Sequence, residues 1–354
     1  MSIEKLKIML SERNASALIM SEDNVRYFTS FSSTNGYLLV TAENSFFLTD
    51  SRYVEAAQKT IKTVDGVLLF ENFEKSLLPL VKELGVKTLS IEGGRTTVKR
   101  LHELKKQFPS VTFETEKLDG EIDVLRAVKS NEECEKIIKA QRIAEKAFSL
   151  LLPKVAVGKT ERELSLELDY TMLKLGAQGL SFETIAVSGK NGSMPHGIPS
   201  DKKIESGDFV TFDFGAIYKD YHSDMTRTVA VGEISDKQRD VYETVLKAQK
   251  SAIDAVAAGK SCFDIDKIAR DIIEEKGYGK YFGHGLGHGV GIEIHEFPTV
   301  SPRSQTVLEP GHVITIEPGI YIPGEFGVRI EDMIYVTVNG GKNLTNCPKE
   351  LTIL

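Results

Sequence analysis

Four acidic residues interrupt the most strand-like segments in the second half of the sequence, and they constrain the fold more than any other feature. Asp213 lies within VTFDFGAIY, and Asp224 follows eleven positions later, after the turn-like KDYHS. Glu317 lies within VITIEPGIY, and Glu331 follows fourteen positions later within GVRIEDMIYV. Aspartate is normally depleted in strands. Each pair fits a strand–turn–strand unit, in which antiparallel pairing would bring the two acids together.

These carboxylates need a compensating charge if folding buries them, because a buried charge without a partner is very costly. For any single acid, exposure to solvent or pairing with an arginine such as Arg227 or Arg329 is a sufficient explanation. Two similar units that converge would instead bring four negative charges together, and two divalent cations would balance them. The pattern therefore predicts a dinuclear metal site.

Histidines gather in a glycine-rich segment between the two acidic units. The stretch YFGHGLGHGVGIEIHE, residues 281–296, holds three of the seven histidines, His284, His288 and His295. Its glycines allow the backbone to approach a ligand closely. A further histidine, His196, lies upstream in SMPHGIP. We expect these histidines to share a site with the acids.

The first third of the chain has a different pattern. A length of 354 residues exceeds one ordinary core, which predicts two domains. Residues 1–122 alternate helix-like and strand-like stretches, which indicates a small α/β domain with a mostly parallel or mixed sheet. The acidic, glycine-containing LDGEID places the boundary near residues 118–128.

Residues 123–354 combine well-marked helices with β-rich stretches, and this grouping predicts an α+β domain. Three capping boxes precede apolar-periodic stretches and predict helix starts. They are Ser130-x-x-Glu133, Thr160-x-x-Glu163 and Ser235-x-x-Gln238.

Bulk properties exclude several classes of function. The net charge is −7 with no basic block, so nucleic acid is not an expected partner. No apolar run reaches the roughly 18 residues needed to cross a bilayer, and the N-terminus lacks a secretory apolar region. The cysteines Cys134, Cys262 and Cys347 lack metal-ligand spacing, which favours free thiols in the cytoplasm.

Taken together, the segments TFDFGAIYKDYHSDMTRT, GHGLGHGVGIEIHE, ITIEPGIY and VRIED resemble the pita-bread metallopeptidases. That group includes methionine aminopeptidase, aminopeptidase P, prolidase and the metal-free creatinase. The resemblance covers residues 123–354 and implies a pita-bread catalytic domain. NVRYFTSF and the TDSRY of residues 49–53 resemble the non-catalytic N-terminal domain of the aminopeptidase P, prolidase and creatinase branch. Methionine aminopeptidases generally lack that domain.

The resemblance implies a role for each matching residue. The metal ligands would be Asp213, Asp224, His288, Glu317 and Glu331. Asp224 and Glu331 would flank both ions, with Asp213 on one ion and His288 and Glu317 on the other. The residues that contact substrate or transition state would be His196, His284 and His295, and Arg329 would steady the site or a substrate carbonyl. Oxygen-rich ligation with one imidazole favours manganese or cobalt, with zinc as a further alternative.

The implied reaction is hydrolysis of the bond before proline at the N-terminus of a peptide. Glu317 would carry the proton from the attacking water to the proline nitrogen, and His295 would stabilise the oxyanion. Thr299 stands where some prolidases place an arginine for the dipeptide carboxylate, and Arg303 is the nearest substitute. We therefore expect an Xaa-Pro aminopeptidase, with the Xaa-Pro dipeptidase (prolidase) as the alternative.

Two other functions are less favoured. A catalytically inactive binding protein would be expected to have lost ligands, and a creatinase-like amidinohydrolase would need no metal. The expected partners are proline-containing peptides or dipeptides and a second copy of the chain in a homodimer.

Overall fold

The computed structural model describes residues 2–354, which form two compact units. The first ends at Arg126 and the second begins at Ala127. Within residues 2–354, no helix combines the length and apolarity needed to cross a membrane.

The first unit contains one six-stranded sheet in the order β4-β3-β2-β1-β5-β6. Its strands are β1 (Ser16–Ile19), β2 (Gly36–Val40), β3 (Ser45–Thr49), β4 (Gly66–Leu69), β5 (Thr88–Ile91) and β6 (Thr112–Glu114). β1–β2 and β2–β3 pair antiparallel, whereas β3–β4, β1–β5 and β5–β6 pair parallel. The sheet is therefore mixed, which is one of the two arrangements, mostly parallel or mixed, that the sequence predicted.

Helices cover both faces of this sheet. They are α1 (Ser2–Glu12), α2 (Glu22–Thr29), α3 (Val54–Thr60), a π-helical turn (Phe73–Leu77), α4 (Leu78–Glu83), α5 (Val98–Gln107) and α6 (Leu118–Ala127). Side chains alternate along β1, so Ala17 and Ile19 enter one apolar core and Leu18 enters the other. α6 belongs to the first of these cores through Leu118 and Ile122.

The second unit has four long helices in two pairs. They are α7 (Asn131–Leu151), α8 (Glu161–Lys174), α9 (Asp236–Ala255) and α10 (Cys262–Glu275), with short 3₁₀ turns at Leu152–Lys154, Gly189–Ser193 and Gly279–Tyr281. All three predicted capping boxes are present, with both reciprocal hydrogen bonds, at the starts of α7, α8 and α9.

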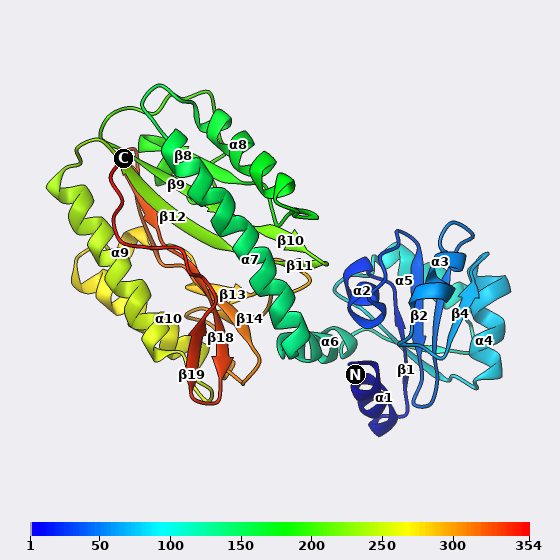
Figure 1. The fold of residues 1–354 in the computed structure, drawn as a ribbon. Helices are drawn as coiled ribbons and strands as arrows, with labels where there is room; N and C mark the ends of the chain where they lie inside the picture. Colours follow the sequence, from blue (N-terminus) through cyan, green and yellow to red (C-terminus); the bar gives the residue numbers. More distant parts are fainter. Residues whose placement is uncertain (1) are drawn as a thin grey trace. The chain divides into compact units, whose positions relative to one another are not determined.

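The strands of the second unit lie between the two helix pairs (Figure 1). They are β7 (Gly179–Leu180), β8 (Ile185–Ser188), β9 (Asp208–Phe214), β10 (Ala216–Tyr218), β11 (Tyr221–His222), β12 (Met225–Val231), β13 (Gly287–Gly289), β14 (Glu296–Val300), β15 (Val313–Ile316), β16 (Gly319–Ile322), β17 (Phe326–Arg329), β18 (Asp332–Thr337) and β19 (Gly340–Asn343). One core joins α7 and α8 to the β8–β9–β12 sheet, and another joins α9 and α10 to the strands that follow. The unit is α+β, as predicted.

Both predicted strand–turn–strand units exist. β9 and β12 pair antiparallel, with Asp213 opposite Thr226. β15–β18 and β16–β17 lie in different sheets but share one register, because Ile316 faces Asp332 and Gly319 faces Arg329. Continuing that register places the segment with Glu317 across from the segment with Glu331, at the junction of the two ladders.

Candidate metal centre

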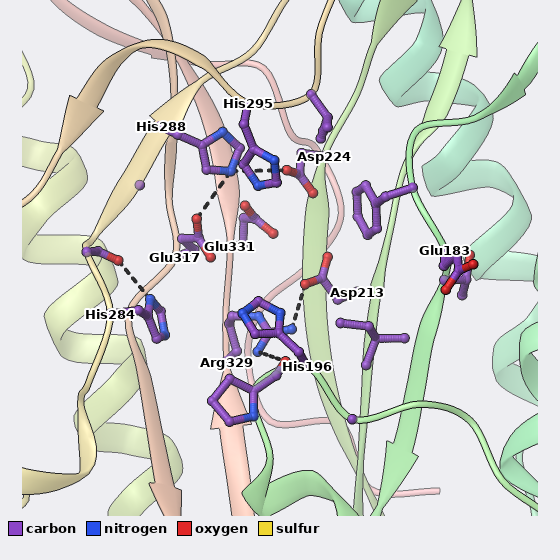
Figure 2. Close-up of a pocket in the computed structure, with 18 of the residues that line it drawn as sticks. Glu183, His196, Asp213, Asp224, His284, His288, His295, Glu317, Arg329 and Glu331 are labelled. Atoms are coloured by element: carbon purple, nitrogen blue, oxygen red, sulfur yellow. Dashed lines mark hydrogen bonds and ion pairs between the residues drawn. The ribbon is translucent and has the colours of Figure 1, made fainter. Parts of the chain in front are cut away.

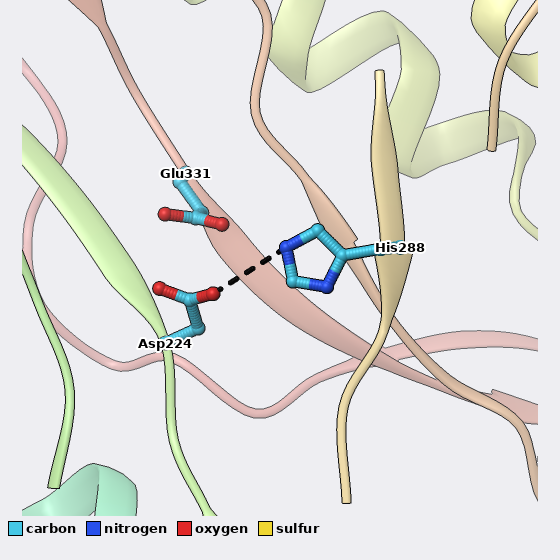
Figure 3. A group of neighbouring side chains, drawn as sticks. All are labelled: Asp224, His288 and Glu331. Carbon is cyan, nitrogen blue, oxygen red and sulfur yellow. Dashed lines mark ion pairs between the residues drawn. The ribbon is translucent and has the colours of Figure 1, made fainter. Parts of the chain in front are cut away.

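Three side chains from separate segments form a compact group of possible ligands (Figure 3). Single ligand atoms of Asp224, His288 and Glu331 all lie within 4.8 Å of one another. Asp224 precedes β12, His288 lies on β13, and Glu331 lies between β17 and β18. Nε2 of His288 is 3.6 Å from Oδ2 of Asp224. The sequence positions are far apart, so the fold builds this group.

The remaining predicted ligands adjoin the group but have partners of their own. Oε1 of Glu317 is 3.4 Å from Nε2 of His288. Asp213, on β9, accepts a hydrogen bond of 2.5 Å at Oδ2 from Nη2 of Arg329. All five predicted ligands line one pocket of about 490 Å³, together with His196, His284, His295 and Arg329. Most of the labelled side chains point toward one another there (Figure 2).

The buried carboxylates of the pocket lack enough positive charge nearby to balance their own charge. Within residues 2–354, the buried Oδ1 atoms of Asp213 and Asp224 have no hydrogen-bond partner. Burial and the neighbouring carboxylates raise the pKa of Asp224 and that of Glu331 well above their ordinary values. Burial also raises the pKa of Glu317 to about 8, against the opposing charge of Arg329. Divalent cations fit such a set, because they replace protons as the balancing charge.

His288 is prepared to act as a neutral ligand. Burial, and then the charge of His295, lowers its pKa to about 4, so its ring is neutral near pH 7. Its Nδ1 lies 3.0 Å from the carbonyl oxygen of Gly289, and since a carbonyl only accepts, Nδ1 carries the hydrogen. The lone pair of Nε2 is therefore directed to the carboxylates. This is the arrangement in which a histidine binds a metal ion.

Two threonines orient candidate acidic ligands, and the sequence analysis missed both. The hydroxyl of Thr226 donates to Oε2 of Glu331 at 2.8 Å. The hydroxyl of Thr315 donates to Oε1 of Glu317 at 3.2 Å and accepts from the backbone N–H of His288 at 3.1 Å. Each threonine lies two positions from an acid, Thr226 after Asp224 and Thr315 before Glu317. Residues two apart share a face of a strand, so this spacing was an available signal.

Arg329 is held within a chain of hydrogen bonds. It donates to the hydroxyl of Tyr321 at 2.8 Å, to the carbonyl of Pro195 at 3.2 Å and to Asp213. Its charge and that of Asp213 therefore balance each other. Four donor contacts, including one from Nε to the hydroxyl of Thr226 at 3.2 Å, hold the guanidinium of Arg329 in place. Tyr321 was not among the predicted residues.

His284 is also held in place. Its Nδ1 donates to the carbonyl of Gly285 at 2.8 Å, which leaves Nε2 to accept from the hydroxyl of Tyr321 at 3.0 Å. Burial lowers the pKa of His284 to about 4 and raises that of Tyr321 to about 12. His284 lines the pocket and is held there by Tyr321, and its predicted contact with substrate stays a prediction.

His295 and His196 face the pocket more openly. The His295 ring lies 4.3 Å from the His288 ring, and burial lowers the pKa of His295. His196 is exposed and follows the Pro195 carbonyl that Arg329 holds. Both histidines line the pocket, and their contact with substrate stays a prediction.

The loop that carries His295 ends at Glu296, which forms a buried ion pair. It connects β13 to β14, where Gly289 pairs with Glu296. Nζ of Lys129 lies 2.6 Å from Oε1 of Glu296, and the two side chains are only 1% and 5% exposed. A Cβ on Gly289 would lie 2.4 Å from the carbonyl oxygen of Phe297, so glycine is needed where the strands approach.

Apolar residues form much of the rest of the pocket wall. They are Phe182, Ile185, Pro195, Ile198, Pro199 and Ile294. Thr299 lines the pocket, whereas Arg303 is exposed and is absent from the lining formed by the described residues. An apolar wall beside a polar centre suits a small ligand with a hydrophobic part.

Comparison with known proteins gives consistent matches over both units. Metallopeptidase family M24 matches residues 135–338, and the creatinase/prolidase N-terminal domain matches residues 3–128. An Xaa-Pro dipeptidase of Pyrococcus horikoshii is 42% identical over 98% of each chain. A solved Xaa-Pro dipeptidase from Bacillus anthracis has a TM-score of 0.96 at 43% identity, covering 100% of this chain and 99% of its own. A solved X-Pro aminopeptidase from Thermotoga maritima has a TM-score of 0.90 at 37% identity, covering 97% and 99%.

Proposed function

This chain belongs to metallopeptidase family M24 and carries a creatinase/prolidase N-terminal domain, and from that membership we propose that it is a metal-dependent Xaa-Pro dipeptidase. The predicted family and the predicted pita-bread fold are confirmed. The observation that carries the proposal is the convergence of four carboxylates and His288 on one pocket with apolar walls. We propose that these five side chains are the ligands of two divalent ions.

The dipeptidase proposal replaces the preference for an aminopeptidase that the sequence analysis drew from Thr299. The relatives described as Xaa-Pro dipeptidases are 42% and 43% identical to this chain, against 37% for the X-Pro aminopeptidase. These identities support the dipeptidase better than the aminopeptidase that the sequence analysis preferred. Thr299 does line the pocket, so its side chain remains a candidate contact for the substrate.

Bound divalent ions would supply a water activated for attack at neutral pH and would polarise the scissile carbonyl. The oxygen-rich ligand set favours manganese or cobalt over ions that prefer thiolates, with zinc as an alternative.

The chain's own residues would orient the substrate and move one proton. Glu317 takes a proton from the attacking water and returns it to the proline nitrogen as the bond breaks, a role open to an ionised carboxylate that lines the pocket. His295, neutral because burial lowers its pKa, donates an N–H to the developing oxyanion. Arg329 holds Asp213 and the Pro195 carbonyl, which fixes the approach to His196.

The pocket wall provides the preference for proline. A proline nitrogen has no N–H to donate, so recognition must depend on the shape of its ring. Phe182 and Ile294 offer apolar surface beside the polar centre. Closing this surface over an apolar ring also excludes water from the reacting bond.

The test compares a dipeptide Xaa-Pro, a tripeptide Xaa-Pro-Xaa and a matched Xaa-Ala after chelation and separate additions of manganese, cobalt and zinc. We expect metal-dependent cleavage of Xaa-Pro alone. Faster cleavage of the tripeptide would restore the aminopeptidase assignment. Metal binding without cleavage of any peptide would indicate a binding protein, and hydrolysis of creatine without metal would indicate an amidinohydrolase.

We also infer that the enzyme works in the cytoplasm as a homodimer. Cys134, Cys262 and Cys347 are all free thiols, which suits a reducing compartment. The family resemblance supports dimerisation, which sedimentation equilibrium would test.

A further inference from the structure

Arg227, on β12, is buried and uses every donor of its guanidinium group. An arginine side chain has five N–H donors. Nε donates to the carbonyl of Pro348 at 2.9 Å, Nη1 to the carbonyls of Thr226 and Glu331 at 2.9 and 2.6 Å, and Nη2 to Oδ1 of Asp332 and the carbonyl of Cys347 at 2.7 Å each. With 2% exposure, the side chain has exchanged water for this complete set of acceptors.

These hydrogen bonds fix the backbone of Glu331 against β12. The carbonyl of Glu331 accepts from Arg227, and its N–H donates to the carbonyl of Thr226 at 3.1 Å. Its carboxylate accepts from the hydroxyl of the same Thr226. Both backbone groups and the side chain of Glu331 are thus bonded to two consecutive residues. Asp224 lies two positions before Thr226, so the same bonds set how far Glu331 stands from Asp224.

Asp332 and Lys349 form ion pairs that hold the guanidinium of Arg227 in place. Asp332, only 1% exposed, accepts from Arg227 at one oxygen and from Nζ of Lys349 at the other, at 2.5 Å. Nζ of Lys349 also donates to Oε1 of Gln249, on α9, at 2.9 Å. The ion pair therefore joins β12, β18 and residues 347–349.

Residues 347–354 are attached to the same strand. Beyond the bonds to the carbonyls of residues 347 and 348, Ala230 of β12 exchanges backbone hydrogen bonds with Thr352 and Leu354 at 2.9 Å each. The hydroxyl of Tyr242, on α9, donates to the carbonyl of Lys349 at 3.0 Å. Arg227 thus connects this segment to the strand that follows Asp224.

We propose that Arg227 is a positioning residue that sets the separation of Asp224 and Glu331 and thereby the affinity of the site for divalent ions. The proposal depends on the proposed assignment of these two residues as ligands. Arg227 touches no ligand side chain, and it acts through the backbone of Glu331 and through Thr226. Lysine cannot replace it, because one ammonium cannot reach five acceptors that lie in the plane of a guanidinium.

A purely structural role makes a different prediction. If Arg227 only supports the fold, its replacement lowers stability and leaves the dissociation constant of the ions unchanged in the protein that remains folded. If it positions the ligands, the dissociation constant rises. Replacing a residue that orients a metal ligand without binding the metal itself typically changes the metal affinity by about 10- to 100-fold.

The experiment measures manganese dissociation constants of folded Arg227→Lys and wild-type protein by competition with a chelator, alongside thermal unfolding of the metal-free forms. Arg270→Lys is the matched control. Arg270 also binds a buried aspartate, Asp266, and two backbone carbonyls in the same unit. We expect both variants to lose thermal stability and only Arg227→Lys to bind manganese about 10-fold or more weakly.

Equal manganese affinity in Arg227→Lys and wild type would overturn the proposal, as would equal weakening in Arg227→Lys and Arg270→Lys. Wild-type protein that binds none of manganese, cobalt and zinc would instead overturn the ligand assignment itself. Should Arg227→Lys not fold, Asp332→Asn replaces it, since this change removes the negative charge that holds the guanidinium and conserves side-chain volume. Wild-type manganese affinity in Asp332→Asn would then overturn the proposal.

Discussion

Nε2 of His288 and Oδ2 of Asp224 lie 3.6 Å apart, too far for a hydrogen bond between them. Two atoms that share one ion at about 2.1 Å each are separated by roughly 3 to 3.5 Å. The two side chains therefore stand close to the spacing of ligands with an ion between them. This relationship makes Asp224 the most informative residue to change.

Asp224→Asn is expected to abolish both metal loading and peptide hydrolysis. The amide keeps the shape of the side chain but removes the negative charge that balances the ions. Metal content of the purified protein and cleavage of an Xaa-Pro dipeptide measure the two effects. Asp240→Asn is the control, because Asp240 pairs with Lys276 at the surface. Full metal content with normal turnover in Asp224→Asn would remove it from the ligand set.

His295→Ala is expected to lower kcat by roughly 10²-fold or more, the scale for loss of an oxyanion donor, while the metal remains bound. The ring lies beside His288 without being part of the close group of ligands. Steady-state kinetics and metal analysis separate the two effects. His102→Ala, in the first unit, should behave as wild type. A kcat within a few-fold of wild type would exclude His295 from catalysis.

The chelated protein is expected to lose stability as the pH rises from about 6.5, the ordinary pKa of histidine, to 8. Burial raises the pKa of Glu317 to about 8. An acid with a raised pKa in the folded state releases its proton first in the unfolded state, so stability falls as the pH increases. Below this window, histidines such as His288, whose pKa burial lowers to about 4, act in the opposite sense.

Glu317 alone would contribute about 2 kcal/mol across this window, at about 1.4 kcal/mol for each pH unit. Urea unfolding at pH 6.5 and 8, with chelator and with manganese, measures the change. Manganese should remove the loss of stability, because the ion balances the carboxylates after their protons leave. A chelated protein whose stability rises over this range would contradict the prediction.

Lys129→Met is expected to destabilise the protein by about 3–5 kcal/mol, the cost of leaving one buried charge unpaired. Glu296 would lose the ammonium that lies 2.6 Å from it in an almost fully buried position. The double variant Lys129→Met with Glu296→Leu should recover most of the loss, since no charge stays behind. Urea unfolding measures all three proteins. Equal stability of the single and double variants would argue against the ion pair as the cause.

The sequence predicted which residues gather in the pocket because acids among apolar, strand-forming residues stand out locally. Asp213 lies within β9 and Glu317 directly follows β15, and an acid among such apolar residues is visible in a short stretch of sequence. The capping boxes were predictable for the same reason, since Ser130 and Glu133 satisfy each other within one turn.

Features made by distant residues could not be predicted in this way. Lys129 and Glu296 are 167 positions apart and carry no mutual signal in the sequence. The helix α6 was not predicted, because it depends on Leu118 and Ile122 entering the core of the first unit despite the glycine between them.

The common register of β15–β18 and β16–β17 limits how this protein can vary in length. Strand side chains alternate, so inserting one residue in either strand turns every following side chain to the opposite face. An insertion in β15 would turn Glu317 away from the pocket, and an insertion in β17 would turn Glu331 away, so each change would remove one of the two acids. Insertions and deletions among natural relatives should therefore fall in the turn at residues 323–325, where they leave the pairing on both sides unchanged.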